Sequence, residues 1–203
     1  DGYASHWYHF WADILRAKER MQGAAGMSGK PYVAFIKDFV RTNKPYDQFV
    51  REQIAGDEIS PDDPEHLVAV GFLRQGPWEL TSMEVPRVAR QRFLDDVTNS
   101  VGETFLAHSL QCAKCHDHKF DPIPQVDYYR MAAAFWGGTI DPGGRSEMGG
   151  PNDKQLGFEE VFGWTDVHRN PPPIHLLING DPDKKSVIVQ PGHLSLVKHL
   201  DHP

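Results

Sequence analysis

The sequence predicts a mainly α fold, an irregular helical domain with long loops and a small C-terminal β-hairpin. Three observations support this prediction. Apolar residues recur at three- and four-residue spacing through most of the first 136 residues, as they do on one face of a helix. Proline and glycine become frequent between residues 137 and 173, where the periodicity disappears, and this indicates a loop-rich segment. The strand-like runs, IHLLI and SVIVQ, follow that segment and are joined by NGDPDKK, whose residues favour tight turns.

Length and composition indicate one globular domain. A chain of 203 residues and 22.9 kDa can bury one substantial core. We therefore treat residues 1–203 as a single domain with a helical part (1–136), a loop-rich segment (137–173) and a C-terminal hairpin and tail (174–203). The chain opens with DGYASHWYHFW, which resembles the middle of an aromatic helix and contains no basic leader, so we expect a fragment or subunit of a larger protein.

Charge and hydropathy argue against two classes of partner. The formal net charge of −7 and the isoelectric point near 5.8 leave no basic stripe for a phosphate backbone, so we expect no nucleic-acid partner. No apolar run approaches the about 20 residues that a membrane-spanning helix needs, so we expect no transmembrane segment.

The first helix is predicted from about residue 3 to residue 21. Apolar side chains at helical spacing mark one of its faces. They are Trp7, Phe10, Trp11, Ile14 and Leu15. We expect Trp7 and Trp11, four positions apart, to pack in the core, and the run GAAGMSGKP to end the helix.

Four shorter helices are predicted elsewhere in the chain. The second covers residues 32–42. After a Lys-Pro pair, the run YDQFVREQIAG predicts a third helix that stops near Gly56, and residues 62–70 form a short fourth. Beyond the turn DPIPQ, the run VDYYRMAAAFWG, residues 126–137, predicts the last helix.

The longest helix is predicted over residues 86–111, and Pro86 is tolerated in its first turn. Its apolar stripe consists of Leu94, Val97, Val101 and Phe105. His108 continues this stripe four residues before Cys112, so the two side chains would point to the same side. We expect Phe105 and His108 to line the side of the helix that faces the group bound by the Cys112 thiol.

The stretch LQCAKCHDHKFDP, residues 110–122, contains both cysteines of the chain, and a histidine directly follows the second. C-x-x-C-H is the attachment pattern for c-type haem. The thiols of Cys112 and Cys115 can add across the two vinyl groups on one edge of the porphyrin, while His116 turns under the ring to bind iron. The sequence therefore predicts a haem-binding domain with one covalent haem c, two thioether anchors and His116 as the proximal ligand.

Two alternatives use the same residues. A zinc site could draw on Cys112, Cys115, His116 and His118, although structural zinc usually takes its second pair of ligands from a distant segment. A thioredoxin-like dithiol would open a helix after a strand, whereas these cysteines follow a predicted helix.

His118 lies two positions beyond His116 and cannot easily reach the opposite face of the same porphyrin. It could ligate a neighbouring haem, form a second metal site with Asp117 and Asp121, or hydrogen-bond to the groups around the iron ligand. We expect these three polar side chains to set the orientation of the proximal imidazole or to form an auxiliary site. The alternative is that they satisfy the backbone groups of their own turn.

Five stretches carry a resemblance to a known family: KPYDQFVREQIAGD, GFLRQGPW, LDDVTNSVGETFL, CAKCHDHKFDPIPQVDYY and LLINGDPDKKSVIVQPGHLSLV. Over nearly its whole length the chain resembles the planctomycete cytochrome-associated family, the second planctomycete cytochrome-type domain, which is a domain of unknown function. The resemblance implies a module of a large secreted protein, commonly preceded by a cytochrome c domain and followed by a second uncharacterised domain. It implies no particular reaction.

The sixth iron position has several candidates. Family members often show an Arg-Trp-x-x-His-Trp pattern in the first helix, and in the matching stretch here, HWYHFW, Phe10 stands where the family often has histidine. The first candidate is His9, one residue from the family's position, and His6 lies four residues from it. The next candidates are Met131, on the helix after the motif, and an open site. A histidine pair would give a lower potential than histidine with methionine.

The function predicted from the sequence is that of an extracytoplasmic c-type cytochrome domain, periplasmic or secreted, acting in electron transfer. Its expected partners are other cytochromes or redox domains, and a homo- or hetero-oligomer is possible. One alternative is a haem-dependent oxidoreductase or peroxidase-like enzyme with an open distal site. The other is a binding module with a structural haem or zinc, in which the loop-rich segment is the recognition surface.

Overall fold

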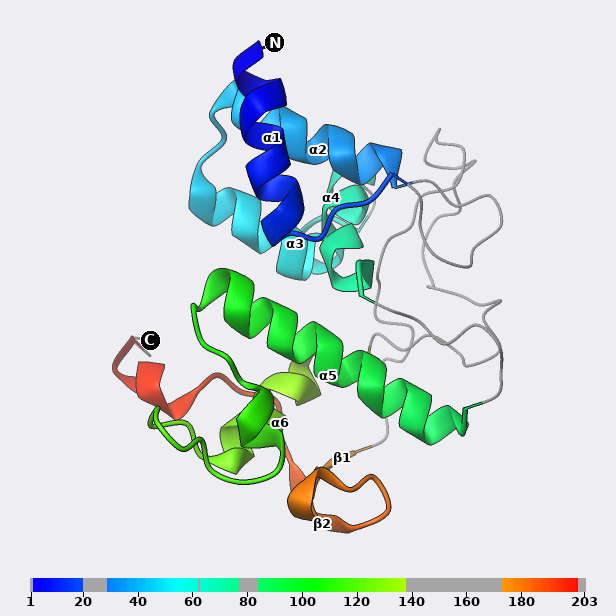
Figure 1. The fold of residues 1–203 in the computed structure, drawn as a ribbon, viewed down its shortest axis with the longest axis vertical. Helices are drawn as coiled ribbons and strands as arrows, with labels where there is room; N and C mark the ends of the chain where they lie inside the picture. Colours follow the sequence, from blue (N-terminus) through cyan, green and yellow to red (C-terminus); the bar gives the residue numbers. More distant parts are fainter. Residues whose placement is uncertain (1, 20–28, 62, 77–83, 138–172, 201–203) are drawn as a thin grey trace. The chain divides into compact units, whose positions relative to one another are not determined.

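The computed structural model describes residues 2–19, 29–61, 63–76, 84–137 and 173–200 (Figure 1). These residues divide into two compact units. Unit 1 comprises the described residues up to 76, and unit 2 comprises residues 84–137 and 173–200. The loop-rich segment is predicted over residues 137–173. Residues 138–172 of it lie outside the described residues.

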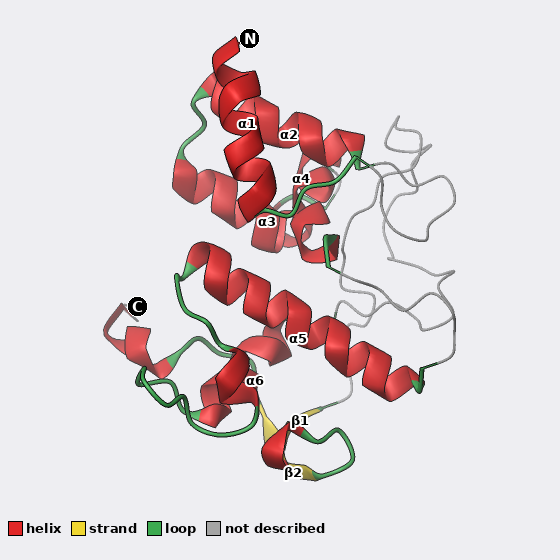
Figure 2. Ribbon diagram, in the orientation of Figure 1, coloured by secondary structure: helices red, strands yellow, loops and turns green. Residues whose placement is uncertain are grey.

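In the described part of unit 1, helices are joined by loops and there is no strand (Figure 2). Its elements are α1 (Gly2–Ile14), α2 (Lys30–Thr42), α3 (Tyr46–Ile59), α4 (Pro64–Ala69) and the 3-10 helix η1 (Val70–Arg74). The second, third and fourth predicted helices are confirmed. A proline in the first turn starts α2, and the Asp63 carboxylate caps α4 by accepting a hydrogen bond from the Glu65 amide at 2.9 Å.

The first helix is shorter than predicted, because α1 ends at Ile14 rather than near residue 21. Arg16 adopts a left-handed conformation with φ 55°. Its amide donates to the Asp13 carbonyl, and the Ala17 amide donates to the Ala12 carbonyl at 2.8 Å, which is the hydrogen-bond pattern of a Schellman motif. An arginine occupies the position where glycine is usual, so the sequence carried no stop signal there.

Aromatic rings form the core of unit 1. Phe49 is fully buried and stacks on Phe39 with ring centroids 3.7 Å apart. Trp11 meets both rings edge-on, at 5.3 Å from Phe39 and 5.7 Å from Phe49, so it packs against this core as expected. The same prediction is wrong for Trp7, which is 41% exposed.

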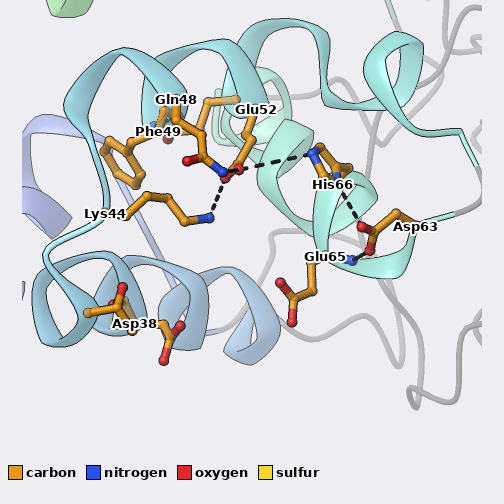
Figure 3. A network of polar contacts seen from close by, with 10 residues as sticks. Asp38, Lys44, Gln48, Phe49, Glu52, Asp63, Glu65 and His66 are labelled. Carbon is orange, nitrogen blue, oxygen red and sulfur yellow. Dashed lines mark hydrogen bonds and ion pairs between the residues drawn. The ribbon is translucent and has the colours of Figure 1, made fainter.

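A buried carboxylate links α3 to its neighbours in unit 1 (Figure 3). Glu52 accepts hydrogen bonds from Lys44 Nζ at 2.5 Å and from Gln48 Nε2 at 2.8 Å. Its side chain is 5% exposed, and the Nε2 atom of His66 on α4 lies 4.0 Å from it. The Nδ1 atom of His66 lies 2.9 Å from an Asp63 carboxylate oxygen. The network therefore connects the α2–α3 corner, α3 and α4.

Unit 2 is built around α6, which contacts α5, η2 and both strands. Its elements are α5 (Pro86–Phe105), the 3-10 helix η2 (Gln111–Lys114), α6 (Gln125–Ala134), β1 (Ile174–Leu177), the 3-10 turn η3 (Ile178–Gly180), β2 (Lys185–Val189) and the 3-10 helix η4 (Ser195–Leu200). The last predicted helix is confirmed. No helix in the described part of the chain combines the length and the apolar character needed to span a membrane.

The predicted C-terminal hairpin is confirmed (Figure 1). The strands β1 and β2 are antiparallel, and Ile174 pairs with Val189 while Leu177 pairs with Lys185. Ile174, Leu177 and Val189 are buried. Because both strands contact α6, these apolar side chains fix the hairpin to the helical part of unit 2.

The long helix also ends earlier than predicted, at Phe105 rather than residue 111. Ala107 is left-handed with φ 55°, and the Gly102 carbonyl accepts hydrogen bonds from the amides of both Leu106 and His108. The chain then folds back so closely that a Cβ on Gly102 would lie 2.6 Å from Leu110 Cδ1 and 2.9 Å from the His108 carbonyl oxygen. The absence of a side chain on Gly102 thus permits this close reversal.

Because α5 ends at Phe105, the apolar stripe predicted along this helix does not continue to His108 and Cys112. His108 and Cys112 are not one helical turn apart, because a left-handed residue and a new 3-10 helix intervene between α5 and the cysteines. The expectation that Phe105, His108 and Cys112 share one helix face is therefore wrong.

We predict that Lys44→Met destabilises the protein by about 3 kcal/mol, because it leaves the Glu52 carboxylate buried without its cation. Urea unfolding followed by circular dichroism measures the change. Arg51→Met is the matched control, on α3 next to Glu52. Its partner Asp47 lies 3.9 Å away and both side chains are largely exposed, so it should cost about 0.5 kcal/mol or less. Equal effects of the two variants would contradict the prediction.

We predict that Gly102→Ala lowers the free energy of unfolding by about 1–2 kcal/mol, although alanine favours helix, because its Cβ would overlap the buried Leu110 side chain and the His108 carbonyl. Thermal unfolding checks this. Gly2→Ala on α1 is the control, since a Cβ there meets nothing within 4 Å. A Gly102→Ala variant at least as stable as the wild type would refute the proposed role of Gly102 in the reversal.

Candidate functional site

The two cysteines lie on one tight turn of unit 2. Cys112 is within η2 and Cys115 directly follows it, with the Cys115 amide donating to the Cys112 carbonyl at 3.3 Å. Side chains three positions apart in a 3-10 helix eclipse one another. Both thiols are free, and this spacing suits two bonds to one edge of a planar group.

Lys114, between the cysteines, is held at both ends. Its Nζ lies 2.6 Å from an Asp95 carboxylate oxygen on α5. Its carbonyl accepts hydrogen bonds from Gln125 Nε2 at 2.9 Å and from the Tyr129 hydroxyl at 2.8 Å, both on α6. The backbone of the cysteine-bearing turn is therefore fixed to two helices.

Asp95 is the acceptor at the centre of this arrangement. Besides the contact with Lys114, its carboxylate accepts hydrogen bonds from the Tyr128 hydroxyl at 2.6 Å and from Gln91 Nε2 at 2.8 Å. Burial, and next the neighbouring Asp95 charge, raise the pKa of Tyr128 well above its ordinary value, and burial also raises the pKa of Tyr129. Both phenols therefore remain protonated donors at neutral pH.

Two aspartates, one in the motif and one on α6, hold the first residues of α6 and η4. Asp117 accepts a hydrogen bond from the Gln125 amide at 2.7 Å, so the residue after His116 caps the N-terminus of α6. Asp127, fully buried on α6, accepts from the Ser195 hydroxyl at 2.8 Å and so holds the start of η4. The motif, α6 and the C-terminal segment are thus connected in series.

His116 is exposed, and its hydrogen bond fixes its tautomer. The Nδ1 atom lies 2.7 Å from the Asp117 carbonyl oxygen. Because a carbonyl can only accept, Nδ1 carries the hydrogen and donates it. The Nε2 lone pair is then available for a metal, which is the arrangement usual for metal-binding histidines.

His118 has the opposite arrangement. Its side chain is 8% exposed, and its Nδ1 faces the Asp121 amide at 2.9 Å and the Asp121 carboxylate at 3.2 Å. A backbone amide can only donate, and it is the nearer group, so Nδ1 accepts and the neutral ring carries its hydrogen on Nε2. The His118 amide also donates to the Ile123 carbonyl. This geometry favours the role of ordering the turn over that of a second metal ligand.

The other predicted residues are distributed over both units. His6 and His9 are exposed on α1 in unit 1, where the His9 ring lies 5.4 Å from the Tyr8 ring. Met131 is buried on α6 in unit 2. Phe105, at the end of α5, and His108, beyond it, are both half-buried.

The described residues do not include a preassembled metal site. Among those residues, no group of three or more His, Cys, Asp or Glu side chains is placed to hold a metal ion. A c-type haem needs a different donor set, two thiols and one imidazole in sequence, and Cys112, Cys115 and His116 follow one another in that order.

A comparison with protein families found one matching family model, PSCyt2, described as a protein of unknown function (DUF1549), over residues 1–138. The chain belongs to this family. The match covers more than half of the chain and includes the cysteine motif and α6 of the PSCyt2 domain. Neither the comparison with curated proteins nor that with solved structures found a match.

Sequence reasoning missed the residues that hold the motif of this PSCyt2 chain in place, namely Asp95, Lys114, Gln125, Tyr128 and Tyr129. Asp95 and Tyr128 are 33 positions apart, so no local pattern joins them. One signal was available: adjacent tyrosines beside a glutamine and an aspartate in an otherwise apolar run, where buried polar groups need partners.

We predict that the two histidines of the motif are opposite neutral tautomers. Nitrogen-15 NMR of the haem-free chain, at a pH where both rings are neutral, should show the hydrogen of His116 on Nδ1 and that of His118 on Nε2. The reason is that one ring faces a carbonyl and the other an amide. His116→Ala and His118→Ala variants assign the signals. Identical tautomers would show that one of the two hydrogen bonds does not form.

Proposed function

We propose that this PSCyt2 chain is a c-type cytochrome domain that carries one haem c and serves electron transfer outside the cytoplasm. The observation that carries the proposal is the state of His116. Its Nδ1–H is donated to the Asp117 carbonyl at 2.7 Å, which leaves the Nε2 lone pair of this exposed side chain available beside the turn that carries both thiols.

The residues present fit the group. Cys112 and Cys115 would hold it through thioethers, and His116 would bind the iron. Gly180 lies against Cys115, where a Cβ would come within 2.7 Å of the sulfur, so only a residue without a side chain fits beside this thiol. Haem c would supply a reversible one-electron couple.

The anchoring of the turn supports relay rather than substrate chemistry. Lys114 is held by Asp95 through its side chain and by Gln125 and Tyr129 through its carbonyl, so the residues on either side of it have little freedom. His116 follows directly, and its ring is held by the Asp117 carbonyl. A ligand with a fixed orientation keeps the same geometry in both oxidation states, which suits electron transfer.

Location and partners follow from the chemistry. Covalent haem attachment takes place outside the cytoplasm, so we propose a periplasmic or secreted domain. Other cytochromes or redox domains would exchange electrons with it, in keeping with the cytochrome-associated name of the family. The sequence pI near 5.8 favours a basic or neutral docking surface on such a partner.

The test is expression of the full chain in a host competent in covalent haem attachment. The intact mass under denaturing conditions should exceed that of the polypeptide by one haem, and a pyridine haemochrome spectrum should report two thioethers. His116→Ala should retain the added mass but lose the wild-type iron spectrum. A bare polypeptide mass for the wild-type chain would refute the proposal.

His118→Ala is the matched control for the iron ligand. Since Nδ1 of His118 accepts from the Asp121 amide, this variant should keep the wild-type iron spectrum and lose about 1–2 kcal/mol of stability with the hydrogen bond. An iron spectrum altered in His118→Ala and unchanged in His116→Ala would reverse the assignment of the proximal ligand.

A further inference from the structure

The two thiols of the motif have different surroundings. Cys112 is exposed, whereas Cys115 is half-buried. The buried Gly180, in the connection between β1 and β2, approaches Cys115 so closely that a Cβ on it would lie 2.7 Å from the sulfur. The same Cβ would lie 3.2 Å from Lys114 Cε. The hairpin connection thus covers one thiol and leaves the other open.

The covering turn has a defined shape. Asn179 and Gly180 have φ values of 54° and 71°, and the Asp181 amide donates to the Ile178 carbonyl at 3.1 Å. Two left-handed central residues closed by this bond form a type I′ turn, which an Asn-Gly pair adopts readily. Gly180 therefore meets two requirements at once, positive φ and the absence of a side chain against Cys115.

Two polar contacts attach the connection between β1 and β2 to the helices of unit 2. At its base, Gln125 Nε2 donates to the Leu177 carbonyl at 3.0 Å. Two residues beyond the type I′ turn, the Arg87 guanidinium on α5 donates to both carboxylate oxygens of Asp183, at 2.7 and 3.1 Å. This second contact lowers the pKa of Asp183, but both side chains are exposed, so it is a weak fastening.

We propose that the β1–β2 connection, residues 178–184, covers Cys115 as a clasp. The thiols then react in a fixed order, Cys112 first and Cys115 after this connection opens. The electrophile is soft and carbon-centred. With a vinyl group, the sulfur forms a bond to one carbon and the thiol proton ends on the other. With iodoacetamide, the thiolate displaces iodide and the proton goes to solvent. The order of haem attachment rests on the proposed function, whereas the clasp does not.

Local opening is sufficient for this behaviour. The apolar side chains of β1 and β2 that pack on α6 remain buried when only the connecting residues 178–184 lift away. Segments held by a few exposed polar contacts open far more often than the core unfolds. The reactivity of Cys115 should therefore follow the strength of the contacts at the turn rather than global stability.

The test is alkylation of the reduced, haem-free full chain by iodoacetamide, with each cysteine followed by peptide mass spectrometry. Each rate is divided by the rate of the same cysteine in urea, which removes the intrinsic reactivity of its neighbours in sequence. We expect the normalised rate of Cys112 to exceed that of Cys115 by about tenfold or more.

Two arginine variants on α5 distinguish the clasp from a general effect. Arg87→Ala removes the contact at the turn and should speed alkylation of Cys115 about two- to fivefold while leaving Cys112 unchanged. Arg92→Ala is the control, because Arg92 is also exposed but pairs with Glu84 rather than with the hairpin. It should leave both rates as in the wild type.

Two results would overturn the clasp. One is equal normalised rates for Cys112 and Cys115 in the wild-type chain. The other is an Arg87→Ala variant in which Cys115 reacts no faster than it does in Arg92→Ala.

A second pair of variants tests the order with haem itself. In a host that attaches haem, Cys115→Ser should accumulate with haem bound through Cys112, whereas Cys112→Ser should accumulate largely without haem. Equal yields of haem on the two variants would contradict the order of attachment. Absence of haem from the wild-type chain would refute the proposed function alone, because the alkylation rates test the clasp independently.

Discussion

The ion pair between Lys114 and Asp95 is the interaction on which the rest of unit 2 depends. Both groups are mostly removed from water, with side chains 25% and 13% exposed, so each would be costly without the other. Asp95 also satisfies Tyr128 and Gln91, and a buried carboxylate with three donors is fully compensated. The turn that carries both cysteines is thereby attached to the middle of α5.

The second attachment runs through α6 and extends to the C-terminus. Gln125 donates one hydrogen bond to the Lys114 carbonyl and another to the Leu177 carbonyl, so a single amide group joins the cysteine turn to the hairpin. Two residues later, Asp127 holds the start of the last 3-10 helix through Ser195. Segments more than sixty positions apart in the chain therefore meet at one short helix, which explains why α6 combines buried polar and apolar side chains.

The chemistry of the site depends on which backbone group each histidine meets. His116 and His118 are two positions apart, yet one ring faces a carbonyl oxygen and the other an amide. This difference leaves a free Nε2 lone pair on the exposed ring and a hydrogen on Nε2 of the buried one. The first can bind a metal, while the second organises the turn that follows. Covering of Cys115 by the hairpin adds a further distinction, between two thiols that are equivalent in the motif.

The sequence by itself determined the elements whose signals are local. Helical periodicity determined the approximate positions of α2, α3 and α4, and the Asn-Gly pair marked the hairpin turn. The C-x-x-C-H spacing predicts that Cys112, Cys115 and His116 would hold a haem, because adjacency along the chain is itself the requirement for that attachment.

Tertiary structure alone decided where α1 and α5 end, because Arg16 and Ala107 are left-handed without a sequence signal. After α5, the chain reverses where the Leu110 side chain packs against Gly102, which has no side chain. No periodic pattern encodes this contact. The partners of Lys114 lie 11 to 19 positions away, and their choice depends on the packing of α5 against α6. Buried polar groups must find hydrogen-bond partners, but the fold determines which partners are within reach.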